Sequence, residues 1–109
     1  MGGAGGGTNP EELFAVGYAA CFEGALGTVA RRERLDAGDV SIESRVHLMP
    51  TPERGFRLGV DLDVSLPSVP DPEQAVRLVA AAHQVCPYSN ATRGNIPVTL
   101  TANGQPVED

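Results

Sequence analysis

The sequence contains no lysine and no tryptophan, and only 5% of its residues are aromatic. Without lysine, the chain cannot carry a Walker A phosphate loop or the Schiff-base chemistry of lysine-dependent enzymes. All eight basic residues are arginines, and the formal net charge is −6. Neutralising the phosphates of nucleic acid or of an anionic membrane requires a basic face, so neither partner is expected.

The sequence also lacks a run of eighteen apolar residues and a leader segment of the secretory type. We therefore expect no membrane span and no export signal, which leaves the cytoplasm as the default location. Only two cysteines are present, Cys21 and Cys86. In a reducing compartment, a cysteine pair is more often a transient catalytic or sensory disulfide than a permanent one.

The length of 109 residues, with 41% apolar residues, predicts one domain spanning 1–109. The first seven residues, MGGAGGG, are too rich in glycine to hold a fixed conformation and predict a flexible lead. No glycine trio in this stretch has the spacing of a dinucleotide-binding fingerprint, so we interpret the stretch as a connector.

A helix is predicted to begin at Asn9, the N-cap, with Pro10 at its first position and Glu12 closing a capping box. Helical character continues until the charged residues 31–34. Because the middle of this segment is apolar nearly all round, we expect a buried helix.

Alternating apolar residues predict half-buried strands over residues 40–48 and 56–66, joined by a turn over 50–55 as an antiparallel hairpin. Asp71 and Gln74 predict the start of a second helix, which ends near Val85. A last strand follows over residues 96–102, before a polar tail. The order α-β-β-α-β predicts an α+β fold in which sheet faces cover buried helices.

The two cysteines allow several interpretations. They can be small core residues, a redox pair or, together with His83, an incomplete set of zinc ligands, since a structural zinc site needs four. A thiol of ordinary pKa is only about 3% thiolate at pH 7, so a nucleophilic cysteine needs an activating group. Cys86 follows a helix C-terminus, which opposes negative charge, and Cys21 in mid-helix needs a cationic partner. Small residues surround Cys21 at helical spacing and would allow another backbone to approach: Gly17, Ala20, Gly24 and Ala25.

Two segments, TNPEELFAVGYAACFEGAL (8–26) and AAHQVCPYSNATRGNIPVTL (81–100), closely resemble the organic hydroperoxide resistance (Ohr) branch of the OsmC/Ohr family. The resemblance implies an intertwined homodimer with two central helices wrapped by antiparallel sheets. It also implies a cytoplasmic thiol peroxidase without a metal or other cofactor. The implied substrates are alkyl or fatty-acid hydroperoxides, and the implied reductant is the dithiol of a lipoylated protein.

By the same resemblance, Cys21 in AACF is the peroxidatic thiol, Cys86 in QVCP the resolving thiol, and Glu11 in NPEE the active-site glutamate. Family members carry further strands and a thiolate-pairing arginine upstream of the glycines, where this sequence begins. None of its eight arginines lies in a matching motif. The sequence is therefore a shortened form, another arginine substitutes, or the protein is a non-catalytic dimeric scaffold or redox sensor.

The predicted helix adds a geometric condition for Glu11. In one straight helix, the ten residues from Glu11 to Cys21 span about 15 Å along the axis. A contact between the two side chains requires either a break near Gly17 or a Glu11 supplied by the partner subunit of a dimer.

Overall fold

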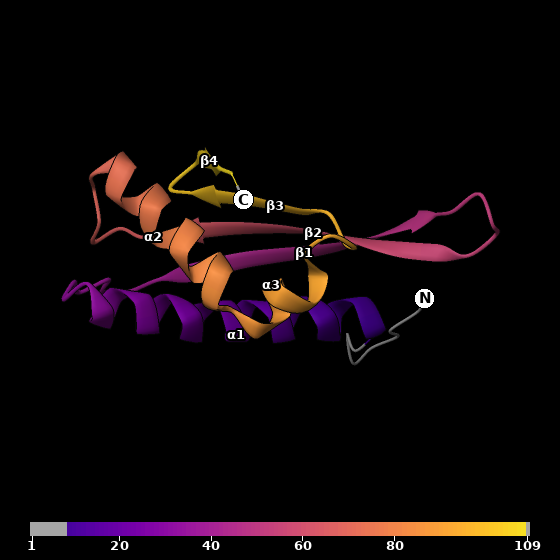
Figure 1. Ribbon diagram of the computed structural model, residues 1–109, viewed down its shortest axis with the longest axis horizontal. Coiled ribbons are helices and arrows are strands. Elements are labelled where there is room, and N and C mark those ends of the chain that lie inside the picture. The colour runs from indigo at the N-terminus through magenta and orange to yellow at the C-terminus, as the bar shows by residue number, and fades with distance from the viewer. Residues whose placement is uncertain (1–8, 109) are drawn as a thin grey trace.

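A computed structural model describes residues 9–108 of the chain as three helices and a four-stranded sheet (Figure 1). The predicted flexible lead, residues 1–7, lies outside the described residues. The elements in chain order are α1 (Pro10–Arg32), β1 (Ser41–Pro50), β2 (Phe56–Ser65), α2 (Pro72–Val85), α3 (Pro87–Thr92), β3 (Val98–Ala102) and β4 (Gln105–Val107). The α+β fold class predicted from the sequence is confirmed.

Helix α1 begins as its capping residues predict. The side chain of Asn9 accepts a hydrogen bond from the backbone N–H of Glu12 at 2.8 Å and donates one to the Glu12 carboxylate at 2.9 Å. The helix continues unbroken for 23 residues and ends with Arg31 and Arg32 in its last turn, where cations suit the helix dipole. By length and composition, α1 would also pass as a membrane span, a test that core helices of globular proteins pass as well.

The sheet has the strand order β1-β2-β3-β4 and is mixed rather than wholly antiparallel. The pairs β1–β2 and β3–β4 are antiparallel, and the predicted hairpin is confirmed, with Ser41 opposite Ser65 and Pro50 opposite Phe56. The pair β2–β3 is parallel, because α2 and α3 lie between these strands in the chain and return it to the same end of the sheet.

Two elements were not predicted, α3 and β4. The sequence carried a signal for each of them. Pro87 occupies the first turn of α3, a position that proline favours, and Asn103-Gly104 forms the two-residue turn between β3 and β4 with positive φ at both residues. The side chain of Asn103 also accepts a hydrogen bond from the backbone N–H of Leu66 at 2.7 Å, which ties this turn to the end of β2.

Helices α1 and α2 pack against each other, α1 beside β1, and α2 against β3 and β4 (Figure 1). The core between them is apolar, and its largest fully buried side chains include Tyr18, Phe22, Leu26, Leu62, Leu66 and Leu78. The prediction that α1 is buried all round is wrong for the single chain. Leu13 and Val16 of α1 are 62% and 68% exposed, because the sheet and the other helices cover only one side of the helix.

Candidate active site

The fold brings the two cysteines together although 65 positions separate them. The Sγ of Cys86 lies 3.3 Å from the Sγ of Cys21, and both thiols are free. Cys21 is partly exposed on α1, whereas Cys86 is fully buried. A disulfide bond is about 2.05 Å long, so the two sulfur atoms need to move only a short distance to form one.

Cys86 occupies the junction between α2 and α3. Its backbone N–H donates to the carbonyl of Ala82 in α2, and its own carbonyl accepts from the N–H of Asn90 in α3. The prediction that Cys86 faces only a helix C-terminus is therefore incomplete, because the residue is also the N-cap of α3. No helix was predicted between Val85 and residue 96, so this second role was missed.

The environment of Cys21 favours the neutral thiol. Burial raises the pKa of Cys21, and the neighbouring Cys86 thiol raises it further, while a hydrogen bond from the backbone of Tyr88 lowers it. Among the described residues, no cationic side chain contributes to this pKa. The activating cation that a nucleophilic thiol needs is thus not provided by residues 9–108 of a single chain.

An aromatic cluster adjoins the thiol pair on the side of the α1 N-terminus. Phe14, Tyr18 and Tyr88 lie with ring centroids 5.6–6.2 Å apart in tilted or edge-on arrangements. Tyr88 packs over Gly17, where an added Cβ would lie 3.0 Å from the Tyr88 hydroxyl oxygen. The small residues near Cys21 were predicted to admit another backbone. At Gly17 the close neighbour is instead the side chain of Tyr88, and at Gly24 an added Cβ would have no neighbour within 4 Å.

Beside Cys86 lies a buried polar cluster that the sequence analysis missed. The Tyr18 hydroxyl lies 2.8 Å from Ser89 Oγ and 3.2 Å from Thr92 Oγ1, and His83 Nδ1 lies 2.7 Å from Ser89 Oγ. The guanidinium of Arg93 donates to the carbonyl of His83 at 2.8 Å. His83, considered above as a metal ligand, is thus directed at a hydroxyl. Within residues 9–108, no three His, Cys, Asp or Glu side chains are grouped to hold a metal ion.

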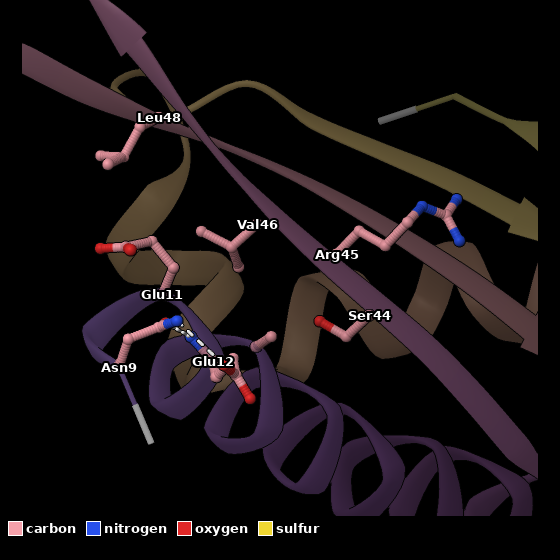
Figure 2. Close-up of a pocket in the computed structure, with 8 residues that line it drawn as sticks. Asn9, Glu11, Glu12, Ser44, Arg45, Val46 and Leu48 are labelled. Atoms are coloured by element: carbon pink, nitrogen blue, oxygen red, sulfur yellow. Dashed lines mark hydrogen bonds between the residues drawn. The ribbon is translucent and has the colours of Figure 1, made fainter. Parts of the chain in front are cut away.

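Glu11 lies on the first turn of α1, in a hollow of about 500 Å³ between that turn and β1. Figure 2 shows its side chain rising toward β1, near Val46 and Leu48. Since α1 runs without a break, the possibility of a break near Gly17 is ruled out. Within one chain, the structure does not bring Glu11 to Cys21.

Arg45 borders the same hollow, but its guanidinium points away from α1 (Figure 2). It lies 2.6 Å from an oxygen of Asp63 and 2.7 Å from one of Glu43, on the outer face of the sheet. Asp63 also accepts a hydrogen bond from Thr101, and these two contacts hold the pKa of its carboxyl below the usual range. The guanidinium of Arg45 therefore binds carboxylates on the face of the sheet opposite to the thiols.

Comparison with known proteins identifies the family. A family model described as OsmC-like protein matches residues 3–101. An organic hydroperoxide resistance protein of Xanthomonas axonopodis pv. citri is 56% identical over 103 residues, which is 93% of this chain and 71% of that protein.

Solved structures agree with this match. The crystal structure of an organic hydroperoxide resistance protein from Legionella pneumophila superposes with a TM-score of 0.83 at 55% identity, over 91% of this chain and 72% of that one. The organic hydroperoxide resistance protein OhrB of Bacillus subtilis gives a TM-score of 0.81 at 53% identity, over 86% and 69%. The chain belongs to the OsmC-like protein family and is similar to its organic hydroperoxide resistance members.

Proposed function

We propose that the protein is a cysteine-based peroxidase that reduces organic hydroperoxides to alcohols in the cytoplasm. The observation that carries this proposal is the pair of free thiols, with 3.3 Å between Cys21 Sγ and Cys86 Sγ, at the centre of an Ohr-like fold. One thiol is partly exposed and the other is fully buried, which suits a division between a thiol that meets substrate and one that resolves the product.

In the first step, the thiolate of Cys21 attacks the distal oxygen of the hydroperoxide. An S–O bond forms as the O–O bond breaks, and the alkoxide leaves as an alcohol after taking up a proton. The sulfur is oxidised to a sulfenic acid and the peroxide is reduced. Phe14 and Tyr88, the two rings of the aromatic cluster that are not fully buried, support an alkyl hydroperoxide as the substrate in preference to hydrogen peroxide.

In the second step, Cys86 attacks the sulfenic sulfur of Cys21. An S–S bond forms as the S–O bond breaks, and hydroxide leaves as water with the proton of the Cys86 thiol. An external dithiol, which we assign to a lipoylated protein, then reduces the disulfide by thiol–disulfide exchange and returns both cysteines to thiols. The reaction needs no metal or other cofactor.

We further propose that the working form is a homodimer. Leu13 and Val16 on α1 and Phe56 on the hairpin are large apolar side chains that the single chain leaves 62–72% exposed. Leu13 and Val16 are neighbours one turn apart on α1, and contiguous exposed apolar surface is characteristic of interaction sites. A second copy would cover it, and would also deliver Glu11 to the Cys21 of its partner, since the unbroken α1 keeps the two residues of one chain apart.

A second candidate function is a non-catalytic scaffold or a slow redox sensor of the same fold. The raised pKa of Cys21 favours it, because a thiol that stays protonated at neutral pH reacts slowly with peroxides. The two candidates differ in turnover, whereas they share the fold, the dimer and the ability to form a disulfide.

The deciding experiment measures consumption of cumene hydroperoxide by the purified chain with dihydrolipoamide as reductant. We expect turnover in the parent and a loss of at least about 1,000-fold in Cys21→Ser, the order seen when a covalent nucleophile is removed. Cys86→Ser should consume about one equivalent and then accumulate oxidised Cys21. No turnover in the parent, with Cys21→Ser indistinguishable from it, would refute the peroxidase and leave the scaffold or sensor.

A further inference from the structure

Among the described residues, the three polar side chains that are almost fully buried gather at one place in the fold. His83, Ser89 and Thr92 are at most 3% exposed, and all three belong to the hydrogen-bonded cluster around the Tyr18 hydroxyl. Burying hydroxyl and imidazole groups costs free energy unless they are hydrogen-bonded. A fold with apolar side chains of the same shape at these positions would often be as stable. The position of this cluster therefore calls for an explanation beyond packing.

The cluster joins the three helices at the point where the two thiols meet. Tyr18 lies on α1, three residues before Cys21, while Ser89 and Thr92 lie on α3, which begins directly after Cys86. His83 lies on α2, three residues before Cys86. The bonds of Tyr18 to Ser89 and Thr92 connect α1, which carries Cys21, to α3, which follows Cys86. The bond of His83 to Ser89 connects the two helices that flank Cys86.

Short helices have little stability of their own, and α3 has only six residues. Its place is therefore fixed by tertiary contacts, which include the bonds of Ser89 and Thr92 to Tyr18 and the bond of Ser89 to His83. Cys86 is the N-cap of this helix, so its sulfur follows any movement of the first turn of α3 relative to α1. A movement of a fraction of the 3.3 Å separation would already change the rate of disulfide closure.

We infer that Tyr18, Ser89 and His83 are positioning residues for the resolving step, and that they hold Cys86 within reach of the oxidised Cys21. The inference rests on the proposed peroxidase function and adds to it the residues that set how fast the sulfenic acid is resolved. When resolution is slow, the sulfenic acid persists and a second hydroperoxide oxidises it to the sulfinic acid, losing an alcohol in the process. The cluster thereby protects Cys21 from irreversible oxidation.

The test compares Tyr18→Phe, which removes only the hydroxyl, with Thr28→Val as a matched control. Thr28 lies on the same helix, and its hydroxyl donates to the carbonyl of Gly24, away from the thiols. Reduced protein is mixed with cumene hydroperoxide, and the sulfenic acid, disulfide and sulfinic acid are followed by rapid quench and mass spectrometry.

In Tyr18→Phe, the first oxidation of Cys21 should stay within about twofold of the parent. Disulfide closure should slow about fivefold, which corresponds to the net free energy of roughly one hydrogen bond. The yield of sulfinic acid at high peroxide should rise in proportion. Thr28→Val should match the parent in all three measurements. Closure and sulfinic yield equal to the parent, even with a lowered melting temperature, would overturn the inference and leave the cluster with a packing role.

A second measurement does not involve peroxide. The equilibrium of the Cys21–Cys86 disulfide with glutathione gives the effective concentration of one thiol toward the other, which should fall about fivefold in Tyr18→Phe and stay unchanged in Thr28→Val. An unchanged equilibrium refutes the positioning role. If the parent consumes no hydroperoxide, the proposed function fails, while this equilibrium still decides the inference. Should Tyr18→Phe not fold, Thr92→Val carries the same test. It loses the 3.2 Å bond to Tyr18 and the 3.1 Å bond that the Thr92 hydroxyl donates to the Ser89 carbonyl within α3, and only the first of these joins α3 to α1. The expected loss is about two- to threefold.

Discussion

A single chain supplies packing and hydrogen-bond partners to one side of α1 more completely than to the other. On the side that faces α2 and α3, Cys21 meets the buried thiol of Cys86, and the buried polar side chains beside it have hydrogen-bond partners. On the side that borders β1, Val16 is 68% exposed, and the hydroxyl of Ser44 is buried without a hydrogen-bond partner among the described residues.

This difference separates the two halves of the proposed reaction. Resolution of the sulfenic acid needs only groups that one chain brings together, namely the thiol pair and the cluster that positions it. Activation of Cys21 needs a cationic group that lowers its pKa, and no described residue of one chain brings one to it. The unbroken α1 also keeps Glu11 of the same chain apart from Cys21. We call the side of α1 that borders β1 the open side. A second subunit bound there would complete the site.

The largest effect is expected from charging the open side. In the double variant Leu13→Glu/Val16→Glu, dimerisation would bury two unpaired carboxylates of each subunit, so the dissociation constant should rise at least about 100-fold. Sedimentation velocity at micromolar concentration should then show monomers in place of dimers. Ser65→Glu, which adds a charge at an exposed position on the outer face of the sheet, serves as control. A monomeric parent, or a double variant that remains as dimeric as the parent, would contradict the proposed use of this surface.

A smaller effect should distinguish a position of α1 that the chain covers from one that it leaves uncovered, at two glycines seven residues apart on the same face of the helix. Gly24→Ala meets no neighbour within 4 Å and should raise the free energy of unfolding by about 0.5–1 kcal/mol, the gain of alanine over glycine within a helix. Gly17→Ala brings its Cβ to 3.0 Å from the hydroxyl oxygen of Tyr88, and displacing that ring should cancel the gain. Urea denaturation of both variants measures the difference. Equal stabilisation at the two positions would show that Tyr88 moves aside freely.

Much of the fold could be predicted from the sequence because its signals are local. The Asn9 cap and Pro10 fixed the start of α1, and the period of two in residues 40–48 and 56–66 predicted the hairpin and its buried face. The parallel pairing of β2 with β3 was not predicted, because pairing between strands distant in sequence depends on how the intervening helices pack. The exposed side of α1 was missed for a related reason. An apolar helix surface can be buried by its own chain or by another chain, and the sequence pattern is the same in both cases.

The two thiols of the site could be predicted from the sequence, whereas the side chains around them could not. Cys21 and Cys86 were singled out by the small residues near them and by the family resemblance, and the structure brings their sulfur atoms together. The cluster of Tyr18, Ser89 and His83 escaped prediction because hydroxyl and imidazole side chains are usually exposed. Only the packing of three helices shows that these side chains share one buried point.

The smallest effect is expected at Arg45, which borders the hollow of Glu11 but points to the carboxylates on the outer face of the sheet. The raised pKa of Cys21 means that its thiolate forms only as the pH rises above the usual range of a thiol, so its rate of alkylation by iodoacetamide should still be climbing there. In Arg45→Ala, this pH profile should coincide with that of the parent, because burial and not Arg45 sets the pKa of Cys21. A profile displaced to higher pH in Arg45→Ala would make Arg45 the substitute for the family's activating arginine, and the open side of α1 would then be more nearly complete than its geometry indicates.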